Sequence, residues 1–126
     1  MKRIIIVLMM LVSMVSFSND VTIEQYLQIK NFLVGTETLE KIKSNAVKVY
    51  ELYIEKGYIE SDLLTSTIKT TRKIWDKLDK NEKEIFLLSL LVAIEEKTDE
   101  CSVMVQVDYT TVLWVIDETI YTHKVY

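Results

Sequence analysis

The sequence of 126 residues contains no proline and only two glycines, Gly35 and Gly57. Tight turns depend mostly on Gly, Pro, Asn and Asp, so a fold with many strands and hairpins is hard to build from this composition. Each glycine follows an amphipathic stretch, at the position where a glycine commonly ends a helix. The scarcity of both residue types therefore predicts a helical protein.

The chain has one cysteine, Cys101, and one histidine, His123. A single cysteine cannot form an intramolecular disulfide, so Cys101 is either a buried, unreactive thiol or a candidate for an intermolecular disulfide that links a homodimer. The neighbouring Asp99 and Glu100 raise the pKa of a thiol, which argues against a nucleophile. A zinc site needs three or four ligands, so no metal site is expected, and His123 is expected to be exposed near the end of the chain.

The motifs that accompany common enzyme chemistries are missing as well. The sequence has no G-x-S-x-G, no glycine-rich phosphate loop and no dinucleotide fingerprint. Adjacent carboxylates on a helix point about 100° apart, so neighbouring acids do not converge on one site as a glycosidase requires. The adjacent acids are Glu95-Glu96, Asp99-Glu100 and Asp117-Glu118. We therefore expect no catalytic residues, no cofactor and no enzymatic activity.

Acidic residues outnumber basic ones, 19 to 15, for a net charge of −4. An acidic domain repels phosphate backbones, and the sequence has no run of Lys and Arg with aromatic residues between them. Nucleic acid is therefore not expected as a partner.

The N-terminus has the three parts of a secretory signal peptide. Lys2 and Arg3 form a basic start, an apolar run follows over residues 4–15, and Ser16 and Ser18 supply small residues before Asn19. We predict cleavage after Ser18, which leaves one domain over residues 19–126 that is exported to the periplasm or the medium without a stable membrane anchor. The alternative is an uncleaved anchor, although a spanning helix needs roughly 18 or more apolar residues and this run is shorter.

The remaining chain predicts two helices that begin at recognisable caps. Thr22 and Gln25 form a capping box, Val21 and Tyr26 can form a hydrophobic staple, and Gly35 follows the helix end. The second helix is expected over residues 37–56, with Thr36 as its cap, an amphipathic stripe along one face and Gly57 at its end.

Two further helices are expected in the middle of the chain. A seam of Leu64, Ile68, Thr71, Trp75 and Leu78 at alternating steps of four and three predicts a helix that begins near Ser61. The next helix is expected to begin at Asn81, in a capping box with Glu84. Residues 85–94 are apolar on almost every side, so this helix should be surrounded by the others.

The last segment, residues 101–126, fits two structures. Residues 103–110 alternate as a strand does, and many of the segment's residues are β-branched. A helical stripe is equally good, and Asp117-Glu118 is a poor hairpin turn. We predict a helix here, and hence an all-α bundle of four to five helices; the alternative is an α+β fold with a C-terminal strand pair.

Seven tyrosines are spread through the chain, and tyrosine is enriched in binding surfaces. Tyr53 and Tyr58 flank the turn at Gly57, with Glu55 and Glu60 beside them. We take these four residues as a candidate partner-binding surface, with the hypothesis that an acidic and aromatic turn docks a basic protein partner.

Two stretches, "NFLVGTETLEKIKSN" and "TIKTTRKIWDKLDKNEKEIFLLSLLVAIEEKTDEC", resemble in their spacing the small exported helical immunity proteins of the Tai type. The resemblance spans residues 31–101 and implies a protein that protects bacteria from cell-wall-cleaving effectors delivered by type VI secretion. Together with the export signal, it favours a small exported helical protein that acts by binding another protein, as an inhibitor or immunity protein. The alternative is a structural or envelope-associated protein, or an adhesin subunit.

Overall fold

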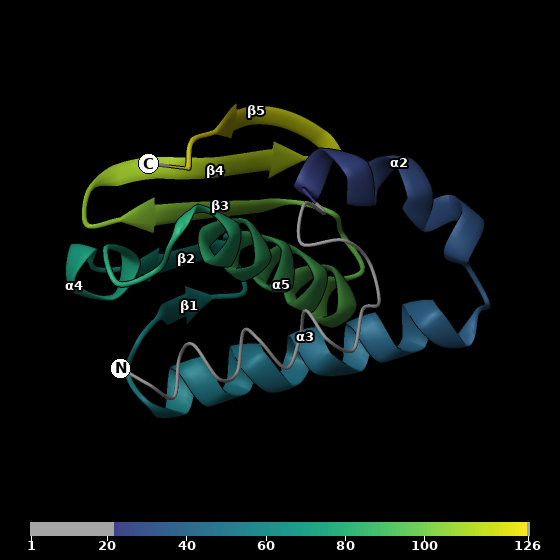
Figure 1. Ribbon diagram of the computed structural model, residues 1–126, viewed down its shortest axis with the longest axis horizontal. Coiled ribbons are helices and arrows are strands. Elements are labelled where there is room, and N and C mark those ends of the chain that lie inside the picture. The colour runs from purple at the N-terminus through teal and green to yellow at the C-terminus, as the bar shows by residue number, and fades with distance from the viewer. Residues whose placement is uncertain (1–21, 126) are drawn as a thin grey trace.

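The computed structural model describes residues 22–125, so the predicted signal peptide and the predicted staple residue Val21 lie outside the described residues. The described chain forms three layers, which are helix α3 (Glu37–Glu55), helix α5 (Lys80–Thr98) and a five-stranded sheet (Figure 1). Helix α2 (Ile23–Leu33) packs beside α5, and the short helix α4 (Arg72–Trp75) precedes it. Among these residues no helix combines the length and the apolar character that crossing a bilayer requires.

The sheet contains strands in the order in which they occur along the chain. They are β1 (Glu60–Asp62), β2 (Thr67–Thr70), β3 (Val103–Val107), β4 (Thr110–Ile116) and β5 (Thr119–His123). Strands β2 and β3 are parallel, and the chain crosses between them through α4 and α5. The other neighbours are antiparallel, as expected where a short turn joins them. The fold is therefore α+β, and the prediction of an all-α bundle is wrong.

The C-terminal segment forms three strands, so the predicted fifth helix is wrong, and the alternative of a strand pair was closer to the structure. The two hairpin turns use residues other than glycine at positive φ. Asp108 has φ 53°, Asp117 has φ 47° and Glu118 has φ 69°. Aspartate tolerates this left-handed region because its short side chain can bond locally, whereas Glu118 takes it up at some cost in strain. Asp117-Glu118, judged a poor turn from its sequence, is therefore the hairpin turn between β4 and β5.

The predicted helix from Ser61 to Leu78 is also wrong, because residues 60–70 form a hairpin. Its loop is built by local bonds, since the Asp62 carboxylate accepts a hydrogen bond from the Leu64 amide at 3.0 Å and Ser66 adopts φ 52°. Leu64, a member of the predicted apolar seam, is 99% exposed at the tip of this hairpin. The many threonines between Thr65 and Thr71 favour extended backbone, and here that preference outweighs the helical spacing.

The helix starts follow the sequence closely. The capping box of Thr22 and Gln25 is confirmed, with its two hydrogen bonds at 3.0 and 3.2 Å, and Thr36 caps α3. The predicted cap at Asn81 is wrong by two residues, because Asp79 caps α5 in a capping box with Glu82. A carboxylate is favoured at this position because it is a charged acceptor beside the positive end of the helix.

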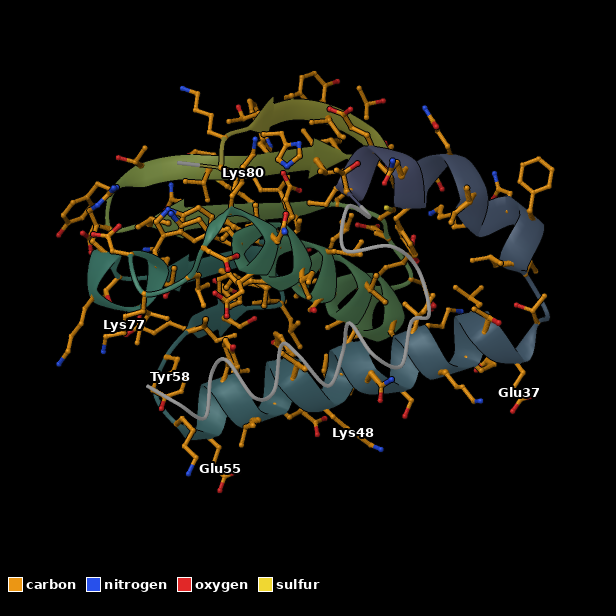
Figure 2. All side chains as sticks on the ribbon, viewed as in Figure 1. Glu37, Lys48, Glu55, Tyr58, Lys77 and Lys80 are labelled. Atoms are coloured by element: carbon orange, nitrogen blue, oxygen red, sulfur yellow. The ribbon has the colours of Figure 1, made fainter. Side chains whose placement is uncertain are left out.

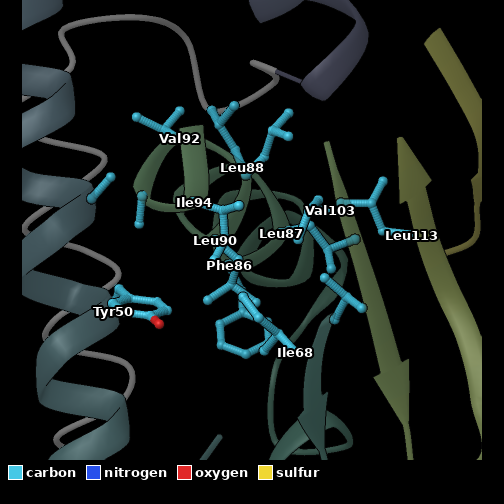
Figure 3. Close-up of a cluster of buried hydrophobic side chains, with 14 of the residues drawn as sticks. Tyr50, Ile68, Phe86, Leu87, Leu88, Leu90, Val92, Ile94, Val103 and Leu113 are labelled. Carbon is cyan, nitrogen blue, oxygen red and sulfur yellow. The ribbon is translucent and has the colours of Figure 1, made fainter. Parts of the chain in front are cut away.

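Helix α5 is the centre of the molecule, as predicted from its sequence. Every residue from Ile85 to Ile94 is buried. Figure 3 shows the reason: Tyr50 of α3 and Val103 of β3 lie on opposite sides of the helix. A helix with apolar residues on every side loses its contact with water only when it is covered on both sides, and α3 and the sheet provide that cover.

Candidate protein-binding surface

The two faces of the sheet differ in what covers them. Along β3, Val103, Val105 and Val107 are buried beneath α5, whereas Met104 and Gln106 point to the other side and are half-buried. The strand register places further side chains on this second face, which we call the outer face. Its members are Glu60, Asp62, Thr67, Lys69, Met104, Gln106, Thr111, Trp114, Ile116, Thr119, Tyr121 and Thr122. The helices of residues 22–125 lie on the opposite, inner side of the sheet, where α5 packs against it and α3 packs on α5 (Figures 1 and 3).

Two aromatic side chains, Trp114 of β4 and Tyr121 of β5, lie together on one half of the outer face. Trp114 is 37% exposed and Tyr121 is 59% exposed, and their ring centroids lie 5.2 Å apart. The pair depends on a β-bulge: Trp114 pairs with Thr122, but the next residue, Val115, pairs with Ile120, so Tyr121 is an extra residue in β5. A bulge redirects a side chain, and here it turns Tyr121 onto Trp114.

The other half of the outer face is hollowed along the edge strand β1. Two adjoining hollows of about 460 and 330 Å³ share Glu60 and Lys69, and we call them together the trough. The trough is lined by Gly57, Tyr58, Ile59, Glu60, Ser61, Asp62, Thr65, Thr67, Lys69, Thr70, Thr71, Met104, Gln106, Asp108 and Tyr109. It therefore follows the chain without a break from Gly57 to Asp62.

The turn at Gly57 positions one of the predicted binding residues. The Tyr58 amide donates a hydrogen bond to the Tyr53 carbonyl, and the Gly57 amide donates one to the Ile54 carbonyl. Gly57 adopts φ 74°, and these three features define a Schellman motif at the end of the helix. The hydrophobic contact typical of this motif is present, because the rings of Tyr53 and Tyr58 meet edge to face at 5.6 Å. The motif thus holds Tyr58 at the C-terminal end of α3, the end that also carries Glu55 (Figure 2).

The four residues predicted as a contact surface are not equivalent in the structure. Tyr53 is fully buried, so its side chain belongs to the core and offers a partner no surface. Tyr58 and Glu60 line the trough, whereas Glu55 is exposed on α3 and does not line it. Sequence reasoning missed Trp114, Tyr121 and the strand residues of the trough, and the alternation of residues 103–110 was the signal that could have indicated them.

Cys101 is a free cysteine that is buried in the core. Its side chain is buried, with 7% of the residue exposed, and burial, followed by the nearby Glu95, raises the pKa of the thiol to about 12. A thiol with so high a pKa is almost entirely protonated at neutral pH and is a poor nucleophile. The placement favours the buried, unreactive alternative over an intermolecular disulfide.

His123 is not a free terminal residue but fastens β5 to two helices. Its Nε2 lies 3.0 Å from Oε2 of Glu84 on α5, and its Nδ1 lies 3.8 Å from Oε1 of Glu24 on α2. The side chains of His123 and Glu84 are only 13% and 14% exposed. The hydrogen bond to Glu84 raises the pKa of His123 above its ordinary value of 6.5, and burial, which acts in the opposite direction, does not cancel this effect.

The contacts of His123 predict a pH-dependent contribution to stability. Because the folded-state pKa is raised, the contribution is complete below pH 6.5 and is lost as the pH rises through the folded-state pKa. We expect His123→Gln to lower the free energy of unfolding by about 1–2 kcal/mol at pH 6 and by less at pH 9. Urea denaturation at both pH values measures the difference. An equal loss at the two pH values would show that the charge on His123 has no part in the effect.

Lys30 joins three elements at the other end of β5. Its ammonium group lies 2.7 Å from Glu95 of α5 and 2.6 Å from Glu118 of the β4–β5 turn, and the Tyr26 hydroxyl donates to Glu95 at 3.4 Å. Burial by itself lowers the pKa of Lys30, but the hydrogen bonds with Glu118 and Glu95 outweigh it and raise the pKa. No sequence signal links these residues, because they are far apart in the chain. The ion pairs hold the strained turn at Glu118 against α2.

The outer face offers aromatic, apolar and acidic side chains. Within residues 22–125 no three His, Cys, Asp or Glu side chains come together as metal ligands. Comparison with models of known protein families, with characterised proteins and with solved structures finds no match for this chain. The function therefore has to be inferred from the surface itself.

Proposed function

We propose that this protein acts by binding another protein through the outer face of its sheet. The observation that supports the proposal is the half-exposed aromatic pair of Trp114 and Tyr121, on a sheet face that no helix of residues 22–125 covers. Ile116, 38% exposed, extends the apolar surface beside the pair. Tryptophan and tyrosine are the residues most often found at the energetic centre of protein interfaces. A partner that covers the pair removes this apolar surface from water.

We also propose that this binding takes place outside the cytoplasm. A signal peptide over residues 1–18 would deliver the domain to the cell envelope or the medium, where an inhibitor or immunity protein meets its target. A sheet face supplies a rigid, preformed surface, which suits tight binding because little order is lost when the partner docks. The arrangement requires no catalytic group.

Affinity capture with matched variants tests the proposal. The protein, immobilised, is incubated with cell-envelope extract, and the bound proteins are identified by mass spectrometry. The test variant is Trp114→Ala/Tyr121→Ala, and the control is Phe32→Ala, since Phe32 is 84% exposed on α2, away from the sheet. We expect one partner to be captured by the wild type and the control, with at least a tenfold reduction for the test variant.

Two results would contradict the proposal. One is undiminished capture by Trp114→Ala/Tyr121→Ala, and the other is equal loss with Phe32→Ala. Thermal unfolding of all three proteins shows whether a lost interaction is due to a lost fold.

A further inference from the structure

We propose that the trough binds an extended, positively charged segment of a protein partner, which lies alongside β1. This inference rests on the proposed function and adds the chemistry of the partner. The trough lies along β1, at one edge of the sheet. Strand β1 is the first strand in the sheet, and within residues 22–125 it pairs with β2 alone.

The shape of the trough fits an extended chain. Its lining includes six consecutive residues, from Gly57 to Asp62, followed on the sheet side by residues of β2 and β3. Strand β1 provides three residues of extended edge, so about three residues of a bound segment can pair with it, and the neighbouring residues of the segment reach the turn residues 57–59. Edge strands commonly bind such segments through their unpaired backbone groups, while pockets beside the edge take alternate side chains.

The charge of the trough selects a basic segment. Three carboxylates line it, from Glu60, Asp62 and Asp108, against a single ammonium group, from Lys69. In the described part of the chain, none of the three acids forms an ion pair. Lys69 lies opposite Glu60 in the register, so Asp62 and Asp108 remain uncompensated at the two ends of the trough. The net charge of the chain, −4, also attracts a basic partner at longer range.

Apolar and aromatic side chains complete the trough. Tyr58 and Met104 are half-buried in its walls, and Tyr109 is 99% exposed at the β3–β4 turn. The face of an exposed tyrosine ring attracts Lys and Arg through a cation–π interaction. The stems of these basic side chains can meanwhile cover the apolar walls. Alternating basic and apolar residues therefore match the lining.

A second copy of this chain fits the trough poorly. Antiparallel pairing of two β1 strands about Ser61 would place Glu60 of one copy opposite Asp62 of the other, and like charges in that position repel. The opposite edge of the sheet, β5, is protected from such pairing by the bulge at Tyr121.

Fluorescence anisotropy with synthetic peptides tests the inference. The probe is a labelled, capped six-residue peptide that alternates Lys with Val, and the comparison peptide replaces each Lys with Glu. The test variant is Glu60→Gln/Asp62→Asn. The matched control is Glu37→Gln/Glu40→Gln, which removes the same charge from exposed positions at the far end of α3. We expect saturable binding of the Lys peptide only, weakened at least tenfold by the test variant and less than twofold by the control.

A further variant tests the aromatic contribution without disturbing the core. Tyr109→Ala should weaken binding of the Lys peptide severalfold, because the Tyr109 ring lines the trough and its face attracts Lys; the core is undisturbed because Tyr109 is 99% exposed. Tyr53→Phe should leave peptide binding unchanged, because Tyr53 is buried and offers the peptide no surface.

The outcomes separate this inference from the proposed function. Absence of saturable binding of the Lys peptide, or equal weakening by both charge variants, would overturn the basic-segment inference. Capture of a partner that depends on Trp114 and Tyr121 but not on Glu60 and Asp62 would leave the proposed function in place and overturn this inference alone. Saturable peptide binding that depends on Glu60 and Asp62, together with capture that is undiminished in Trp114→Ala/Tyr121→Ala, would support the trough as the binding site and contradict the role proposed for the aromatic pair.

Discussion

Phe86→Ala is expected to lower the free energy of unfolding by about 4 kcal/mol. Phe86 is fully buried on α5, and its ring lies 5.3 Å from that of Tyr53 on α3 and 6.3 Å from that of Trp75 on α4. Removal of the ring leaves a cavity where three elements meet, and it also removes the aromatic contacts. Domains of this size are typically stable by about 5–15 kcal/mol, so the variant should be close to unfolding.

Urea denaturation followed by circular dichroism measures this change. Phe32→Ala is the matched control, since the same atoms are removed from a side chain that is 84% exposed, and we expect a loss of less than about 0.5 kcal/mol. Phe86→Leu, which refills much of the space, should lose about 1–1.5 kcal/mol. A cost below about 1 kcal/mol for Phe86→Ala would mean that α5 is not enclosed as described.

The second large effect is expected from Lys30→Met, at about 3 kcal/mol. Lys30 has a side chain only 10% exposed, and it lies between two carboxylates, of which Glu95 is 21% exposed. Methionine retains the apolar stem but leaves Glu95 partly buried without its counter-charge, and the cost comes chiefly from that unpaired charge. The strained turn at Glu118 also loses the contact that holds it.

A double-mutant cycle isolates this mechanism. Lys30→Met/Glu95→Gln should recover about half of the loss, because the neutral amide removes the unpaired charge. Lys43→Met serves as the control: its pair with Glu96 spans 3.6 Å, the two side chains are 29% and 45% exposed, and an exposed pair contributes less than about 1 kcal/mol. Additive losses in the double variant would rule out an ion pair as the source of the effect.

The two ion-pair sites have a common structural consequence. Lys30 fastens the turn that begins β5, and His123 fastens the end of the same strand to α2 and α5. Tyr121 lies between them and supplies half of the exposed aromatic pair. Contacts on the inner face therefore hold in place a residue that we propose acts on the outer face.

The local signals in the sequence predicted the first half of the fold well. The capping box at Thr22, the cap at Thr36 and the helix end at Gly57 are each set by neighbouring residues, and they are confirmed. The central position of α5 also follows from its own composition, because a helix that is apolar on all sides must be covered. These features depend on interactions within a few residues, which a sequence shows directly.

The sheet could not be predicted in the same way. Its turns rely on Ser66, Asp108, Asp117 and Glu118 at positive φ, where glycine is the usual signal. The cost of the conformation at Glu118 is offset by Lys30, 88 residues earlier in the chain, and no local pattern reveals that contact. The candidate surface was missed for a similar reason. Tyr58 and Glu60 were identified, but the β1–β2 hairpin and the parallel pairing of β2 with β3 bring the remaining lining residues to them.

Within the described chain, one face of the sheet is buried under α5 and the other is left uncovered by the helices. Hydroxyl-radical footprinting of the unmodified protein, read by mass spectrometry, tests this arrangement directly. Its two tryptophans are natural reporters, since Trp75 is fully buried and Trp114 is 37% exposed on the outer face. We predict ready oxidation of Trp114 and Tyr121, with Trp75 and Tyr53 protected until the protein unfolds. Protection of Trp114 equal to that of Trp75 would contradict the account.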